Sequence, residues 1–121
     1  MEHLTHISLG SNLLTGVVPW DTVIAGKLKA LLLGNNMLQG TLQPHLPLSL
    51  EHYVVADNRF EGKLPLTLPS QIKTFIVHQN LLSGPLPNVS GALRLQAITA
   101  HENSLTGGLH LPVAEAMVAE C

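Results

Sequence analysis

The sequence predicts a repeat solenoid built on a parallel β-sheet, and two observations lead to that prediction. Five asparagines recur at spacings of 24, 22, 22 and 23 residues, and a glycine follows each four residues later. The residues before each asparagine alternate between apolar and variable types, which is typical of a strand with one buried face. A nearly fixed period of this size indicates stacked units. The asparagines are Asn12, Asn36, Asn58, Asn80 and Asn103, and the glycines are Gly16, Gly40, Gly62, Gly84 and Gly107.

Apolar columns complete the repeating unit. The positions eight, five and three residues before each asparagine, and two and six residues after it, are apolar in every unit. The columns predict a strand before the asparagine and a thin aliphatic core shared between neighbouring units. We therefore expect one domain over residues 1–121, with repeats that begin near Leu4, Leu28, Leu50, Ile72 and Leu95.

The other elements of the unit each have a physical reason. An asparagine amide can bond backbone groups of its own turn and of the next, so we expect the five to stack in a ladder. The glycine permits a bend that a Cβ would obstruct. A proline lacks an N–H and suits the margin of a sheet. We interpret the asparagines and glycines as structural rather than functional.

The tail of each unit narrows the family. "NLLTGVVP", "NRFEGKLP" and "NLLSGPLP" share the pattern N-x-x-x-G-x-(V/L)-P. Together with the frame L-x-x-L-x-L-x-x-N-x-L, this pattern resembles the plant-type leucine-rich repeat over residues 4 to about 112. The resemblance implies an α/β repeat solenoid, a right-handed arc with a parallel concave sheet, short flanking strands and irregular or 3₁₀ convex turns. Because the family contains receptors, inhibitors and scaffold subunits, it does not by itself select a function.

The ends of the chain show no recognisable cap at the N-terminus and an ambiguous segment at the C-terminus. Residues 113–121 read either as the start of a sixth repeat or as a short closing helix. Repeat arrays need end units with a polar outer face to stay soluble. We therefore expect either a segment of a longer array or partner chains that cover the ends.

Composition argues against several classes of function. Charged residues make up 12% of the chain, the net charge is −2, and the six lysines and arginines are scattered, which argues against nucleic-acid binding. No apolar run approaches the length of a transmembrane helix. The chain carries no activated-nucleophile motif, no phosphate-binding loop and no carboxylate pair in an expected cleft, so we predict no catalytic residues and no cofactor.

Two features bear on the compartment without deciding it. The single cysteine, Cys121, cannot form an internal disulfide. The triplet Asn88-Val89-Ser90 makes Asn88 a candidate glycosylation site in a secretory setting. The family resemblance favours an extracellular or cell-surface location, and an intracellular or organellar assembly is the alternative.

The concave sheet is where we expect a partner to bind. Leu32, Val54 and Ile76 occupy one column on neighbouring strands and predict an apolar stripe on a solvent-facing surface. The alternative is that these residues only reflect β-propensity. The remaining candidates for the face and its polar rim are Ala56, His52, His78, His101, Asp57, Gln79 and Glu102.

The histidines also invite a metal hypothesis, because His78 and His101 share a column near Asp57 and Glu102. No ligand-spacing motif supports it, so we predict no metal site and regard a pH-sensitive interface as the better use of the pair.

Two functions follow from these features. The first is a non-catalytic interaction or structural subunit with protein partners, within a large complex. The second is a ligand-recognition segment of a plant-type receptor ectodomain.

Overall fold

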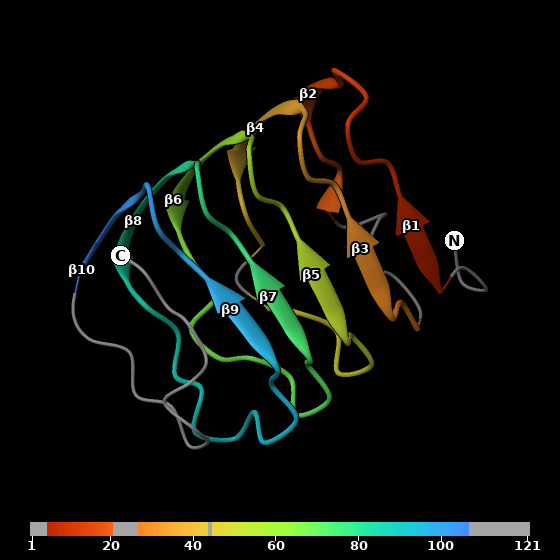
Figure 1. The fold of residues 1–121 in the computed structure, drawn as a ribbon, viewed down its shortest axis with the longest axis vertical. Coiled ribbons are helices and arrows are strands. Elements are labelled where there is room, and N and C mark those ends of the chain that lie inside the picture. The colour runs from red at the N-terminus through yellow and green to blue at the C-terminus, as the bar shows by residue number, and fades with distance from the viewer. Residues whose placement is uncertain (1–4, 21–26, 44, 107–121) are drawn as a thin grey trace.

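The computed structural model describes residues 5–20, 27–43 and 45–106, and these residues form ten strands in two parallel five-stranded sheets (Figure 1). The first sheet has the order β1-β3-β5-β7-β9 and the second the order β2-β4-β6-β8-β10. The first sheet consists of β1 (His6–Ser8), β3 (Ala30–Leu32), β5 (His52–Val54), β7 (Thr74–Ile76) and β9 (Ala97–Thr99). The second consists of β2 (Thr15–Val17), β4 (Met37–Thr41), β6 (Arg59–Lys63), β8 (Leu81–Pro85) and β10 (Ser104–Thr106).

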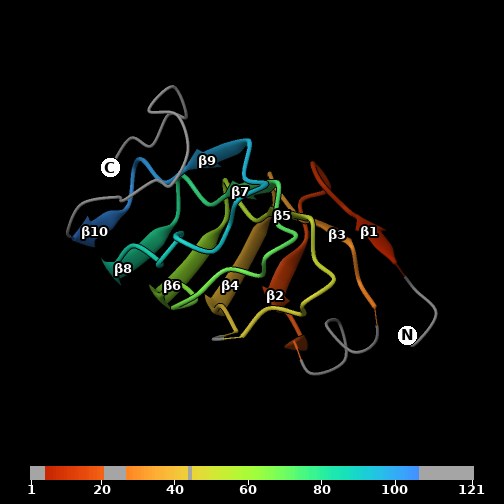
Figure 2. The ribbon, with the colours of Figure 1, turned by 90° about the horizontal axis from the view of Figure 1, so that it is seen from below.

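The chain alternates between the two sheets once in every repeat. It leaves a strand of the first sheet, turns at the asparagine, forms a strand of the second sheet, and returns through a longer connection (Figure 2). Equivalent residues of successive repeats are paired, as Leu31 is with Tyr53 and Tyr53 with Phe75. The predicted solenoid with its parallel sheet and flanking strands is confirmed.

The core lies between the sheets and is made by the apolar columns. Tyr53 and Phe75 are fully buried and stack with their ring centroids 5.4 Å apart. Trp20 packs against Phe60 with a centroid distance of 6.0 Å, and its Nε1 donates a hydrogen bond of 2.8 Å to the carbonyl of Thr41. Four aromatic rings therefore make contacts between repeats: Tyr53, Phe75 and Phe60 lie inside the otherwise aliphatic core, and the partly buried Trp20 packs against it.

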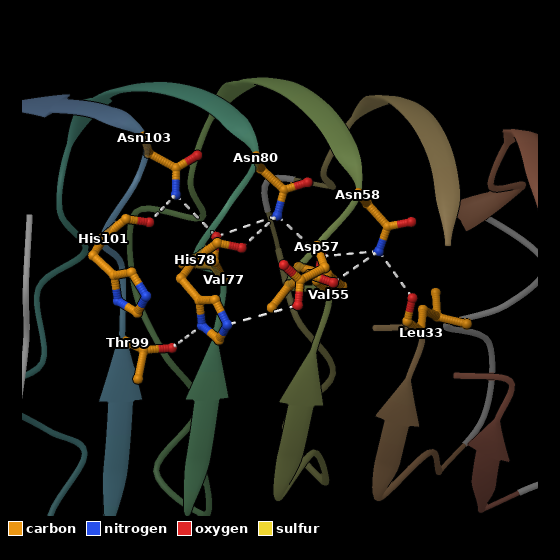
Figure 3. Close-up of polar contacts among 11 residues, drawn as sticks. Leu33, Val55, Asp57, Asn58, Val77, His78, Asn80, Thr99, His101 and Asn103 are labelled. Atoms are coloured by element: carbon orange, nitrogen blue, oxygen red, sulfur yellow. Dashed lines mark hydrogen bonds and ion pairs between the residues drawn. The ribbon is translucent and has the colours of Figure 1, made fainter. Parts of the chain in front are cut away.

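The asparagine side chains connect each turn to the turn before it (Figure 3). Asn58 donates to the carbonyl of Leu33 in the preceding repeat at 2.9 Å and to that of Val55 in its own repeat at 3.1 Å. Its Oδ1 accepts a bond of 3.0 Å from the N–H of Leu38. Asn36, Asn80 and Asn103 repeat this arrangement. These bonds satisfy backbone groups that the turn would otherwise bury without partners.

Two glycines of the second sheet occupy positions where a side chain would be both strained and crowded. Gly62 has φ of +83°, and a Cβ built on it would lie 3.1 Å from Cγ2 of Thr41 on the neighbouring strand. Gly40 has φ of +97° and would contact Val17 at 3.2 Å. Both the left-handed backbone and the close neighbour therefore favour glycine. Gly107, Cys121 and the segment 113–121 lie outside the described residues.

Two positions differ from the columns read in the sequence. Leu9, expected in the core, is 45% exposed, because β1 is an edge of the described sheet and only one described strand packs beside it. Gln43 is buried although its position carries no apolar signal. It accepts a long 3.4 Å bond from the hydroxyl of Tyr53, and its Nε2 has no partner within the described ranges.

Candidate partner-binding face

The outer face of the first sheet carries a row of three aliphatic side chains. Leu32 is paired with Val54, and Val54 with Ile76, so the three stand side by side on β3, β5 and β7. Each is half-buried, while Tyr53 and Phe75, one residue earlier on their strands, are fully buried on the opposite face. Ser8 and Thr99 continue the row at the two ends of the sheet. We call Leu32, Val54 and Ile76 the apolar row.

Polar groups lie beside the apolar row at the start of the strands. His52 Nδ1 lies 3.1 Å from the hydroxyl oxygen of Thr74 on the next strand. One residue earlier, Glu51 and Lys73 form an ion pair of 3.4 Å. This pair was missed in the sequence, although Lys29, Glu51 and Lys73 occupy one column with alternating charge, which could have revealed it.

At the opposite end of the strands, two imidazole rings stack on each other. The rings of His78 and His101 are 4.5 Å apart and inclined by 7° (Figure 3). His78 Nδ1 lies 2.6 Å from Thr99 Oγ1, and its Nε2 lies 3.9 Å from Asp57 Oδ2, an ion pair when His78 is protonated. The structure therefore joins four residues from β9 and three successive turns into one polar cluster.

The residue before each asparagine has a left-handed backbone. The φ values of these five residues lie between 55° and 59°, and we call them the left-handed row: Ser11, Asn35, Asp57, Gln79 and Glu102. Such a backbone suits Asn and Asp better than other side chains. Asp57 therefore fits the turn as well as the rim, whereas Gln79 and Glu102 occupy a conformation that their longer side chains disfavour.

One residue expected on the face does not offer surface to a partner. Ala56 is only 3% exposed, and its methyl group extends just one carbon from the backbone. The remaining expected residues are accessible: Leu32, Val54, Ile76, His52, His78, His101 and Asp57 are half-buried, and Gln79 and Glu102 are exposed.

An open depression lies at one end of the left-handed row, where the chain turns from the first sheet toward the second. It has a volume of about 390 Å³ and is lined by Ser11, Leu13, Asn35, Asn36, Met37 and Asp57. Within the described ranges, no group of three or more histidine, cysteine, aspartate or glutamate residues is placed to hold a metal ion. The same part of the chain contains no helix of the length and apolarity needed to cross a membrane.

Comparison with solved structures decides the family. The plant peptide hormone receptor RGFR1, in complex with RGF2, superposes with a TM-score of 0.78 and 33% identity over 86% of this chain. The chain is a plant-type leucine-rich repeat protein. A second leucine-rich repeat match is a chain of the BIR3–SERK2 complex from Arabidopsis thaliana, with a TM-score of 0.74 and 26% identity over 85% of this chain.

The leucine-rich repeat chain is shorter than both of these proteins. It spans 18% of the RGFR1 chain and 58% of the second chain. No family model matches the sequence, and neither does any curated protein.

Proposed function

We propose that this leucine-rich repeat chain is a non-catalytic recognition module that binds a peptide or protein across the outer face of its first sheet. The observation that carries the proposal is the apolar row, three aliphatic side chains in register on adjacent strands and flanked by polar groups at both strand ends. An apolar centre with a polar rim is the usual composition of a binding surface.

The structural likeness supports the ligand-recognition interpretation over the assembly subunit. One match is a peptide hormone receptor in complex with RGF2, and the other comes from a protein complex. A peptide that crosses the strands of the first sheet would meet Leu32, Val54 and Ile76 in turn, and Gln79 and Glu102 at its polar edge. Gln79 and Glu102 are exposed, so their side chains are accessible to such a peptide.

The test is to select linear peptides from a random display library against the chain and to locate their binding site with variants. We expect Ile76→Glu to weaken the selected peptides at least tenfold, because it places a charge in the apolar row. Leu81→Glu is the matched control, since Leu81 is 65% exposed on the second sheet. Ile76→Thr, which suits a strand, separates lost binding from lost folding. Peptides that tolerate both Ile76 variants and lose affinity with Leu81→Glu would overturn the proposal.

An assembly subunit is the second candidate, and the first repeat favours it. Leu13 is 76% exposed and Val17 is 65% exposed, so the outer side of this repeat presents apolar surface. Light scattering on the purified chain tests this candidate. A mass well above 13.0 kDa that falls with Leu13→Glu would support association through the first repeat, whereas a mass near 13.0 kDa for both chains would exclude self-association.

A further inference from the structure

The triplet Asn88-Val89-Ser90 lies in the connection between β8 and β9, outside the strands of the proposed binding face. We propose that Asn88 is an N-glycosylation site, which accepts an oligosaccharide on its side-chain nitrogen when the chain passes through a secretory compartment. This inference does not depend on which partner the first sheet binds.

The local structure exposes the two side chains that the reaction needs. Val89 is 1% exposed and belongs to the hydrophobic core, whereas Asn88 and Ser90 on either side of it are exposed. Asn88 is held in an extended conformation by a parallel bridge to Thr67 and by a bond of 3.0 Å from its N–H to the carbonyl of Leu66. Because side chains alternate along extended backbone, burial of Val89 directs Asn88 outward, and Ser90 begins the turn that follows.

The hydrogen bonding of Asn88 leaves the reacting atom accessible. Its Oδ1 accepts a bond of 2.9 Å from the N–H of Ser90. Its Nδ2 has no hydrogen-bond partner among the described residues. In contrast, the Nδ2 atoms of Asn58 and Asn80 each donate to three backbone carbonyls inside the turns.

The repeat itself explains why this triplet occurs outside the ladder. The second residue after each ladder asparagine belongs to an apolar core column, so a serine or threonine there would weaken the core: the five residues are Leu14, Leu38, Phe60, Leu82 and Leu105. Asn35 is followed by Asn36 and Met37. Asn88 is thus the only one of seven asparagines with a hydroxyl residue at the required spacing.

The reaction transfers one glycan and involves no oxidation. The donor is a lipid-linked oligosaccharide diphosphate. A bond forms between Asn88 Nδ2 and C1 of the first sugar, the bond from that C1 to the diphosphate oxygen breaks, and the amide nitrogen loses a proton. The lipid diphosphate is the leaving group. The glycan then stands on the side of the connections, and the apolar row on the first sheet remains open to a partner.

The experiment translates the full chain with a signal peptide in the presence of microsomes. A C-terminal tag with its own glycosylation triplet reports which chains have entered the compartment. We expect two glycan mass increments on the wild-type chain and one on Asn88→Asp, and peptide-N-glycosidase F should remove them all. Release of the glycan in heavy-oxygen water should leave a labelled aspartate at residue 88.

Two further variants separate modification from folding. Asn88→Asp keeps the oxygen that accepts the Ser90 N–H, so its thermal unfolding should match that of the unglycosylated wild type. Ser90→Ala should abolish the increment, and Ser90→Thr should retain it. Chains that carry a glycan on the tag and none on residue 88 would overturn the proposal, as would an increment that survives in Asn88→Asp.

Discussion

The imidazole rings of His78 and His101 lie 4.5 Å apart and almost parallel, at the edge of the face that we propose binds a partner. The contact arises from the repeat, because the two residues stand at the same position of successive units. His78 is further held by Thr99 on the side of its Nδ1. The ring therefore has a fixed orientation before any partner arrives, which reduces the entropy that binding must overcome.

His101→Ala should remove the ring that stacks on one face of His78. We expect a loss of about 0.5 kcal/mol in unfolding free energy, the lower end for an aromatic pair, because both rings are only half-buried. The ring proton signals of His78 should shift in an NMR spectrum, because the ring current of His101 is lost. His45→Ala is the control, since His45 is exposed, and it should leave those signals in place. An unchanged His78 spectrum in His101→Ala would show that the rings do not stack in solution.

The asparagine ladder should contribute unequally along the chain. Asn80 is buried and bonds the N–H of Phe60 and the carbonyls of Val55, Val77 and His78. Asn80→Ala leaves the N–H of Phe60 without this partner and removes one of the donors to each carbonyl, and we expect chemical denaturation to show a loss of roughly 2–3 kcal/mol. Asn12→Ala, in the same column, should cost less than about 1 kcal/mol, because Asn12 is exposed and, among the described residues, its amide donates to the carbonyls of Leu9 and Gly10 alone. Equal losses in the two variants would contradict the expectation that a buried ladder asparagine stabilises the fold more than an exposed one.

Replacing Gln79 by glycine should stabilise the fold. A left-handed backbone costs a residue with a side chain roughly 1–2 kcal/mol, and the added freedom of glycine in the unfolded chain costs about 0.5–1 kcal/mol. We therefore expect Gln79→Gly to gain about 0.5–1 kcal/mol in unfolding free energy. The matched control is Gln39→Gly on β4, which should lose about 0.5–1 kcal/mol, because no unfavourable φ is relieved there.

The same variant links strain to function. If the Gln79 side chain contacts the partner, Gln79→Gly should weaken the selected peptides while it raises the melting temperature. Opposite changes in binding and stability are the expected sign of a side chain kept for recognition at a cost in stability. If the variant gains stability and binds as tightly as the wild type, the Gln79 side chain does not contribute to binding and does not belong to the proposed rim.

The sequence predicts the repeating unit well because each repeated position has one physical role. Apolar residues fill the core, asparagine satisfies the turn, and glycine fits beside residues such as Thr41 and Val17. The left-handed backbone of the left-handed row could not be predicted from residue type, because only Asn35 and Asp57 are residue types that favour such a backbone. Here the turn imposes the conformation whichever side chain is present.

The candidate face was predicted less completely than the frame. The register of Leu32, Val54 and Ile76 follows from the period, but their exposed fractions depend on how far each neighbour covers them. Ala56, predicted on the face, is almost fully buried. The stacking of His78 on His101 and the long bond from Tyr53 to Gln43 depend on side-chain orientations, which the sequence pattern does not specify.

High pH should destabilise the protein through Tyr53. Burial raises the pKa of its hydroxyl well above the ordinary value of a tyrosine, because the charged phenolate would lose its hydration in the core. In the unfolded chain the hydroxyl ionises near pH ~10. Above that pH the unfolded state binds fewer protons than the folded state, so the unfolding free energy should fall as the pH rises, and this effect should be absent below it.

Absorbance near the tyrosinate band measures this directly, because Tyr53 is the single tyrosine of the chain. We expect no phenolate signal while the protein is folded, and an abrupt rise that coincides with loss of the circular dichroism of the sheets. Tyr53→Phe is the control, and its unfolding free energy should depend less on pH above about 10. A gradual phenolate titration in protein that is still folded would mean that the hydroxyl reaches water, contrary to its position beside Phe75 and Gln43 in the core.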